Sequence, residues 1–183
     1  GGNNNGYCQD NEITWIHWNE DARDQKMFDF TRALIHLRNE HPVFRRRRFL
    51  AGDAARGGES DRGDIEWFSV NGEHMTDEEW TTAYAKALTI SLNGASIDEP
   101  GKRGERVEDD DFILMFNASE KDLEFTMPQW THDLQWYRVI DTTAQQPIET
   151  DFVRAKLLGS PETVTVHSRS IVVLASPLAD RSL

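Results

Sequence analysis

The sequence contains almost no cysteine and no long hydrophobic run. Cys8 is the only cysteine among 183 residues, which excludes an internal disulfide and agrees with a reducing compartment. No stretch approaches the roughly 20 apolar residues that a membrane-spanning helix needs. No basic segment followed by an apolar one opens the sequence, so we expect no secretion signal. These absences indicate a soluble globular protein, with the cytoplasm as its expected setting.

Basic side chains are also in short supply. Lys and Arg together number 20 against 32 Asp and Glu, which gives a formal net charge of −12. A field of this sign repels phosphate backbones and anionic lipid. We therefore expect neither nucleic acid nor a membrane as a partner, whereas a neutral polymer carries no such penalty.

Motifs for metal or cofactor chemistry are absent from the sequence. No Ser-His-Asp arrangement, phosphate loop or dinucleotide fingerprint is present, so we propose no cofactor. The histidines show no metal-ligand spacing and are expected at the surface or at helix ends. They are His17, His36, His41, His74, His132 and His167. Asp109–Asp111 lacks the alternation of a calcium loop, and we expect a solvated run of charges there.

The first eighteen residues combine side-chain amides with aromatic rings. The amides are Asn3, Asn4, Asn5, Gln9 and Asn11, and the rings are Tyr7, Trp15 and Trp18. Sugars need two-way hydrogen bonds for their hydroxyls and flat apolar surfaces for their C–H faces, and this mixture supplies both. The alternative is an irregular loop whose amides bind its own backbone and whose tryptophans are core.

A helix is predicted from about residue 23 to residue 39. Apolar residues recur at spacings of three and four, at Met27, Phe30, Leu34 and Leu37. Asp21 or Asp24 can cap its start, and Pro42 ends it. Phe28 and Ile35 add a second stripe, so the apolar face is wide and needs a large surface to pack against.

The segment Val43–Leu50 contains four consecutive arginines between apolar residues. A phosphate-binding role is a poor fit because the whole chain is acidic. We predict instead a strand whose arginine stems pack while their charged heads are solvated.

Most of the remaining sequence reads as short strands separated by turn signals. Strands are predicted at 64–69, from about 87 to 92, and at 112–116, 123–127, 134–140, 162–167 and 171–174. Thr76 and Glu79 form a capping box for one or two helical turns, and 51–63 and 97–111 are predicted loops. So many short strands are typical of an antiparallel β-sandwich.

Several of these segments carry a resemblance to a known family. Residues 3–18 and 41–49 closely resemble isoamylase-type glycogen debranching enzymes. These enzymes are glycoside hydrolases of the alpha-amylase superfamily (family 13) that cut alpha-1,6 linkages. Residues 64–94 and 112–142 resemble the same family more moderately. The resemblance implies a mainly β chain, an antiparallel β-sandwich domain preceded by the last loop and helix of a (β/α)8 barrel.

The resemblance also implies a domain division and a setting. Residues 1–42 would end a truncated barrel, and 43–183 would form the sandwich. The catalytic carboxylates of the family lie on earlier barrel strands, before Gly1, so we expect no catalytic residue and no activity in this chain alone. The implied partners are the missing barrel and N-terminal domains and glycogen or branched maltodextrin, in a bacterial cytoplasm.

Three readings of the chain's role follow. In the first, Tyr7, Gln9, Asp10 and Asn11 lie near the substrate end of the barrel, the sandwich braces the barrel, and the helix face around Phe30 and Leu34 causes self-association. Asp10 and Glu12 are expected to cap loop amides rather than to perform catalysis.

The second reading is a stand-alone glucan-binding module that holds sugar on two or more coplanar, exposed rings. The candidates are Trp67, Trp130, Trp136 and Tyr137. Alternation favours the core for Trp67 and Trp136, which leaves Trp130 as the best candidate. The third reading is a scaffold that binds no ligand.

Overall fold

The computed structural model describes residues 6–15, 22–52, 62–83, 85–149 and 155–178. Asn3, Asn4, Asn5, His17, Trp18 and Asp21 lie outside the described residues, as does most of the predicted loop 51–63. The long helix α1 spans Ala22–Glu40, which confirms the helix predicted from periodicity. Among the described residues, no helix is long and apolar enough to cross a membrane.

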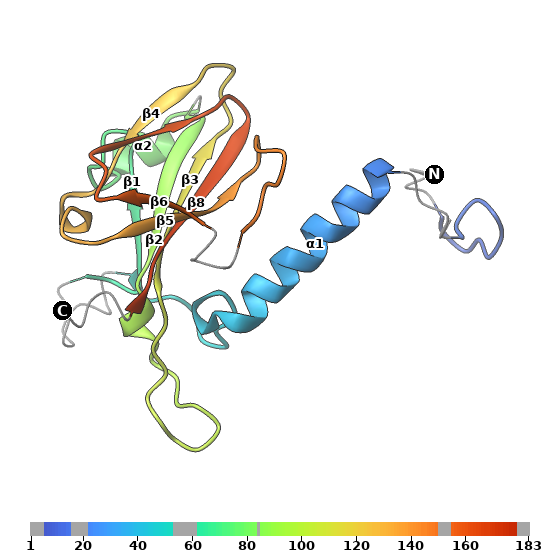
Figure 1. The fold of residues 1–183 in the computed structure, drawn as a ribbon, viewed down its shortest axis with the longest axis horizontal. Helices are drawn as coiled ribbons and strands as arrows, with labels where there is room; N and C mark the ends of the chain where they lie inside the picture. Colours follow the sequence, from blue (N-terminus) through green and yellow to red (C-terminus); the bar gives the residue numbers. More distant parts are fainter. Residues whose placement is uncertain (1–5, 16–21, 53–61, 84, 150–154, 179–183) are drawn as a thin grey trace.

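The strands form two antiparallel sheets that face each other (Figure 1). The larger sheet has the order β1-β2-β3-β8-β5-β6 and the smaller sheet pairs β4 with β7. The strands are β1 (Ile65–Phe68), β2 (Ala87–Leu92), β3 (Asp111–Asn117), β4 (Leu123–Thr126), β5 (Trp136–Asp141), β6 (Lys156–Gly159), β7 (Thr163–Val166) and β8 (Ser170–Ser176). The predicted antiparallel β-sandwich is therefore confirmed, with β6 as a strand that the sequence pattern missed.

Short helical segments connect the strands. The capping box forms as predicted at α2 (Asp77–Thr81), where the Thr76 hydroxyl accepts from the Glu79 N–H and the Glu79 carboxylate accepts from the Thr76 N–H. Single 3-10 turns occur at η1 (Pro42–Phe44), η3 (Gly94–Ser96) and η4 (Gln129–Thr131).

The larger sheet has an inner face, which we define as the face turned toward β4 and β7. Side chains alternate between the two faces along each strand. Ile113, Met115 and Leu174 point inward from β3 and β8 and pack against Phe125 and Trp136. Phe125 and Trp136 are fully buried, so this layer is a closed core between the two sheets.

The opposite face of the larger sheet, which we call the outer face, has a second hydrophobic cluster. Phe112, Val173 and Ala175 are buried there against Leu37 of α1 and Val43 of η1. The end of α1 and the turn after it therefore cover one end of the outer face. From this point α1 projects away from the sandwich (Figure 1).

The prediction of a strand at 43–50 is wrong. Residues 42–44 form a 3-10 turn, and residues 45–50 belong to no strand. The arginine heads are also not all solvated, because Arg46 Nη1 lies 2.8 Å from Asp64 Oδ2 and the two side chains are only 6% and 2% exposed. A buried guanidinium needs such a partner, and Asp64 supplies it from the start of β1.

The expectation of a solvated charge run at Asp109–Asp111 is likewise wrong. Asp109 and Asp111 are buried and Asp110 is half-buried. Each accepts a backbone hydrogen bond: Asp109 from Val43, Asp110 from Leu178 and Asp111 from Gly94. Carboxylates in these positions hold loops against the sheet, because they satisfy N–H groups that would otherwise be buried without a partner.

Candidate functional site

The uncovered part of the outer face is a row of half-buried apolar side chains. The strand register places Trp67 opposite Ile90, Ile90 opposite Leu114, and Leu114 opposite Val173. Phe116 and Ile171 form the next pair along the same face. Trp67, Ile90, Leu114, Phe116 and Ile171 are all only partly buried. One large side of the sheet thus presents apolar surface beyond the end that α1 covers.

Helix α1 has its own exposed apolar stripe. Met27, Phe28 and Ile35 are 64%, 51% and 57% exposed, while Leu34 and Phe30 are partly buried on the side nearer the sandwich. The most exposed apolar side chains on α1 are therefore those of Met27, Phe28 and Ile35, rather than those around Phe30 and Leu34. An exposed stripe of this kind marks an interaction surface.

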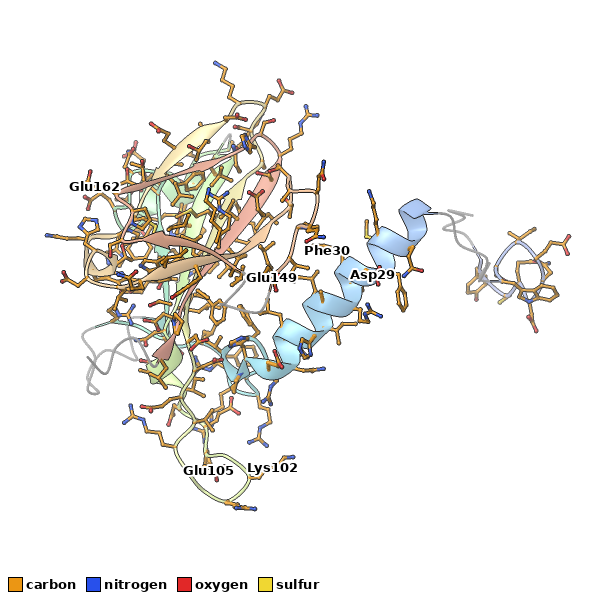
Figure 2. The ribbon with its side chains drawn as sticks, in the orientation of Figure 1. Asp29, Phe30, Lys102, Glu105, Glu149 and Glu162 are labelled. Atoms are coloured by element: carbon orange, nitrogen blue, oxygen red, sulfur yellow. The ribbon has the colours of Figure 1, made fainter. Side chains whose placement is uncertain are left out.

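A groove separates α1 from the connection between β5 and β6. It is lined by Met27, Phe30 and Ala33 on α1, and by Thr142 and residues 144–148 on the other side. Figure 2 shows Phe30 on the side of α1 toward the sandwich, with Glu149 on the sandwich side of the gap. The groove mixes apolar and amide groups, and Ile148 on its sandwich side also packs against the buried cluster of the outer face.

The junction between α1 and the sandwich is held by His41. Its Nδ1 lies 2.7 Å from Asp109 Oδ1 and 3.8 Å from Asp110 Oδ2, and its ring meets Phe112 edge-on at 4.8 Å. Burial lowers the pKa of His41, but the hydrogen bond to Asp109 and the charges of Asp109, Asp110 and Glu40 outweigh it. The pKa is therefore raised above its ordinary value of 6.5.

His41, Asp109 and Asp110 form a cluster that sequence spacing does not reveal. One ligand atom from each of His41, Asp109 and Asp110 lies within 4.8 Å of the others, although His41 and Asp109 are 68 positions apart. Asp109 also accepts from the Val43 N–H, and Asp110 from the Leu178 N–H. These oxygens already serve the junction, so the cluster fits a structural latch better than a metal cage.

Of the predicted sugar-binding residues, four lie in the opening loop. Tyr7 is 85% exposed. Asp10 Oδ1 accepts from the Trp15 indole N–H at 2.8 Å, and the Asn11 side-chain amide donates to Gln9 Oε1 at 3.0 Å. These contacts are local to the loop, which lies beyond the start of α1 (Figure 1). The structure brings Gln9, Asp10 and Asn11 together, while their contact with sugar stays a prediction.

Trp130, the fifth predicted residue, is half-buried beside Trp136. The two rings lie 6.0 Å apart at 63°, so they are not coplanar. The Arg62 guanidinium lies 3.7 Å from the centre of the Trp130 ring, a cation–π contact that covers one of its faces. Trp136 is fully buried, as its alternation predicted. Trp130 therefore has at most one open face, and its role in sugar binding stays a prediction.

A second aromatic pair lies at the β1 edge. Trp67, a predicted candidate that alternation assigned to the core, is only partly buried, and its neighbour Trp80 was not among the predicted residues. Trp80 of α2 is 50% exposed and meets Trp67 of β1 edge-on, with ring centres 5.2 Å apart at 74°. The sequence signal for this pair was the position of Trp80 near the end of the capped turn α2, which comes after β1 and a short hairpin.

Comparison with known proteins places the chain in a family. Residues 64–175 match the family model described as isoamylase, C-terminal. The chain is 39% identical over 178 residues to the glycogen operon protein GlgX homolog of Mycobacterium tuberculosis. The alignment covers 97% of this chain and 24% of that protein. It is 33% identical over 128 residues to a glycogen debranching enzyme of Dickeya chrysanthemi, covering 70% of this chain and 16% of that protein.

Solved structures agree on the fold. The pullulanase of Bacillus acidopullulyticus superposes with a TM-score of 0.54 at 18% identity, covering 96% of this chain and 16% of that one. The chain spans about a quarter or less of the curated relatives it matches. With the family model matched across the whole sandwich from β1 into β8, the chain belongs to the isoamylase C-terminal family.

Proposed function

We propose that this chain is the non-catalytic C-terminal part of a bacterial, cytoplasmic glycogen debranching enzyme that hydrolyses alpha-1,6 branch linkages in glycogen or branched maltodextrin. Residues 1–42 would complete the catalytic barrel and residues 43–183 would brace it. The names of the relatives support the substrate class. The family position supports the assignment to a part of a larger enzyme.

The observation that carries the bracing role is the half-covered outer face. A sheet with two apolar faces is stable in water only when both are covered. The inner face is closed by β4 and β7, whereas Ile90, Leu114 and Phe116 remain partly open. The exposed stripe on α1 and the groove beside it border the same region. A barrel docked against α1 and the outer face removes the apolar area of Ile90, Leu114 and Phe116 from water.

The junction supports a fixed angle between the two surfaces. His41, Asp109 and Val43 tie the end of α1 to the sandwich through hydrogen bonds at 2.7 and 2.9 Å. A rigid junction presents α1 and the outer face as one binding surface, which favours a permanent interface over a mobile linker.

The experiment compares two variants in the longer enzyme that carries this chain. Leu114→Asp places a charge on the outer face, and Gln25→Asp places the same charge on an exposed polar side of α1. We expect Leu114→Asp to lower the thermal unfolding temperature and the rate of glycogen debranching, with Gln25→Asp near the unmodified enzyme. Equal behaviour of the two variants contradicts the proposal, and so does debranching activity in the isolated 183-residue chain.

A glucan-binding module remains the second candidate. Partly open rings at Trp130 and at the Trp67–Trp80 pair favour it, because aromatic faces are the surfaces on which sugars stack. Binding of glycogen by the isolated chain separates this candidate from a bracing role alone.

A further inference from the structure

We propose that Trp67 and Trp80 form a surface site for a linear alpha-glucan chain. The site lies at the β1 edge of the sandwich. Trp67 lies on the edge strand β1, at the margin of the outer face, and Trp80 of α2 contacts it. The inference goes beyond the proposed bracing role and can fail independently of it.

Helix α2 contributes no buried residue to the core. None of its residues is buried, yet its start is fixed by a complete capping box between Thr76 and Glu79. The N–H of Met75 also donates to the Trp67 carbonyl at 3.0 Å, which ties the approach to α2 to the edge strand. The backbone that carries Trp80 is thus fixed, although α2 contributes no buried residue to the core. A large ring that is fixed and half exposed costs little entropy when it meets a ligand.

The two rings form an angled pair. Trp67 and Trp80 meet at 74° with their centres 5.2 Å apart, so their open faces point in different directions. Two platforms at an angle suit a chain that bends, as alpha-1,4-linked glucose chains do. They do not suit a flat chain such as a beta-1,4 glucan, which needs coplanar rings.

Negative charge lies beside the pair. Asp77, Glu78 and Glu79 form the first turn of α2, and Asp77 precedes Trp80 by three residues and so lies on the same side of the turn. Carboxylates repel anionic ligands and accept hydrogen bonds from hydroxyl groups. A neutral, hydroxyl-rich ligand matches both properties, and family membership makes an alpha-glucan the polymer to expect.

The test is affinity electrophoresis of the 183-residue chain through native gels with and without glycogen. We expect glycogen to retard the unmodified chain. We expect Trp80→Ala to weaken the apparent affinity about tenfold, since one ring contact with its buried area is worth about that factor. Trp80→Phe should restore part of the retardation. Phe49→Ala, which removes an aromatic side chain that is 99% exposed elsewhere, should leave mobility unchanged.

Two further measurements complete the test: thermal unfolding and competition by short glucans. The thermal unfolding midpoint of Trp80→Ala should equal that of the unmodified chain, because α2 buries none of its residues. Maltoheptaose should compete with glycogen and cellohexaose should not. The proposal is overturned if the unmodified chain is not retarded, if Trp80→Ala is retarded like it, or if only Trp130→Ala abolishes retardation. None of these outcomes affects the debranching assay with Leu114→Asp, which tests the bracing role.

Discussion

His41 and Asp109 join the end of helix α1 to the start of strand β3 through a 2.7 Å contact between Nδ1 and Oδ1. The side chains are only 14% and 6% exposed, so water screens the contact weakly. The carboxylate also accepts from the Val43 N–H at 2.9 Å. One aspartate therefore fixes both the helix end and the turn that follows it.

The stability of the chain should depend on pH through this contact. The pKa of His41 is raised in the folded state above 6.5, so protonated His41 stabilises the fold. That contribution is complete below pH 6.5 and is lost as the pH rises through the folded-state pKa. We expect the unfolding free energy from urea titration to fall from pH 6 to pH 8.5. In His41→Gln this step should be missing, and a step of unchanged size would contradict the assignment.

A matched control is the pair His167–Asp122, which has a similar distance of 2.8 Å but lies more than half exposed at both side chains. Solvent screens an exposed pair. His167→Gln should therefore leave most of the pH step in place.

The two arginines Arg46 and Arg48 should differ strongly in their effect on stability. Arg46 is buried against Asp64, while Arg48 pairs with Asp98 at exposures of 63% and 90%. Arg46→Met leaves a buried carboxylate without its charge partner, which costs about 3–5 kcal/mol of unfolding free energy. Arg48→Met should cost less than about 1 kcal/mol. Urea denaturation of both variants checks this, and similar losses would contradict it.

Trp136→Ala should be among the most destabilising substitutions in the sandwich. The ring is fully buried between the sheets, and its indole N–H donates to the Thr131 carbonyl at 3.1 Å. Deleting it leaves a large cavity and removes one of the two hydrogen bonds that the Thr131 carbonyl accepts, for a loss of about 3–5 kcal/mol. Trp80→Ala is the control, because α2 buries no residue, and its unfolding free energy should stay near that of the unmodified chain. Calorimetry or urea titration measures both.

The isolated chain should self-associate through α1 and the outer face. Met27, Phe28 and Ile35 form the exposed stripe, and apolar surface of this kind drives association when its partner is missing. Light scattering at rising concentration should show dimers or larger species. The double variant Phe28→Asp, Ile35→Asp should shift the population toward monomer, with Gln25→Asp as the control. A monodisperse monomer at high concentration would refute this prediction.

The main elements of the fold were predictable because their signals are local. Helix α1 follows from apolar spacing, the capped turn α2 from Thr76 and Glu79, and the strands from alternation and turn residues. β6 was missed because it is a short edge strand whose residues Lys156 and Leu157 are exposed, so it carries little pattern. The nearly continuous apolar run Phe112–Phe116 indicates that both faces of β3 are apolar, and it therefore predicts that the outer face is apolar too.

The errors arose where distant residues decide the outcome. Arg46 is buried because Asp64 meets it, and Asp109 is buried because His41 and Val43 meet it. No local pattern shows such pairs, since a charge run looks the same whether it is solvated or paired. The Trp67–Trp80 pair is of the same kind, because only the fold of the hairpin after β1 brings the two rings into contact.

The edges of the larger sheet bear on how the separate chain behaves at high concentration. On one side, β1 is followed by a hairpin that returns to form a bridge between Phe68 and His74. On the other, β6 is only four residues long. Covered or short edges resist the strand-by-strand growth that produces fibrils. Association of this module should therefore proceed by stacking of sheet faces, which saturates in small soluble species and reverses on dilution.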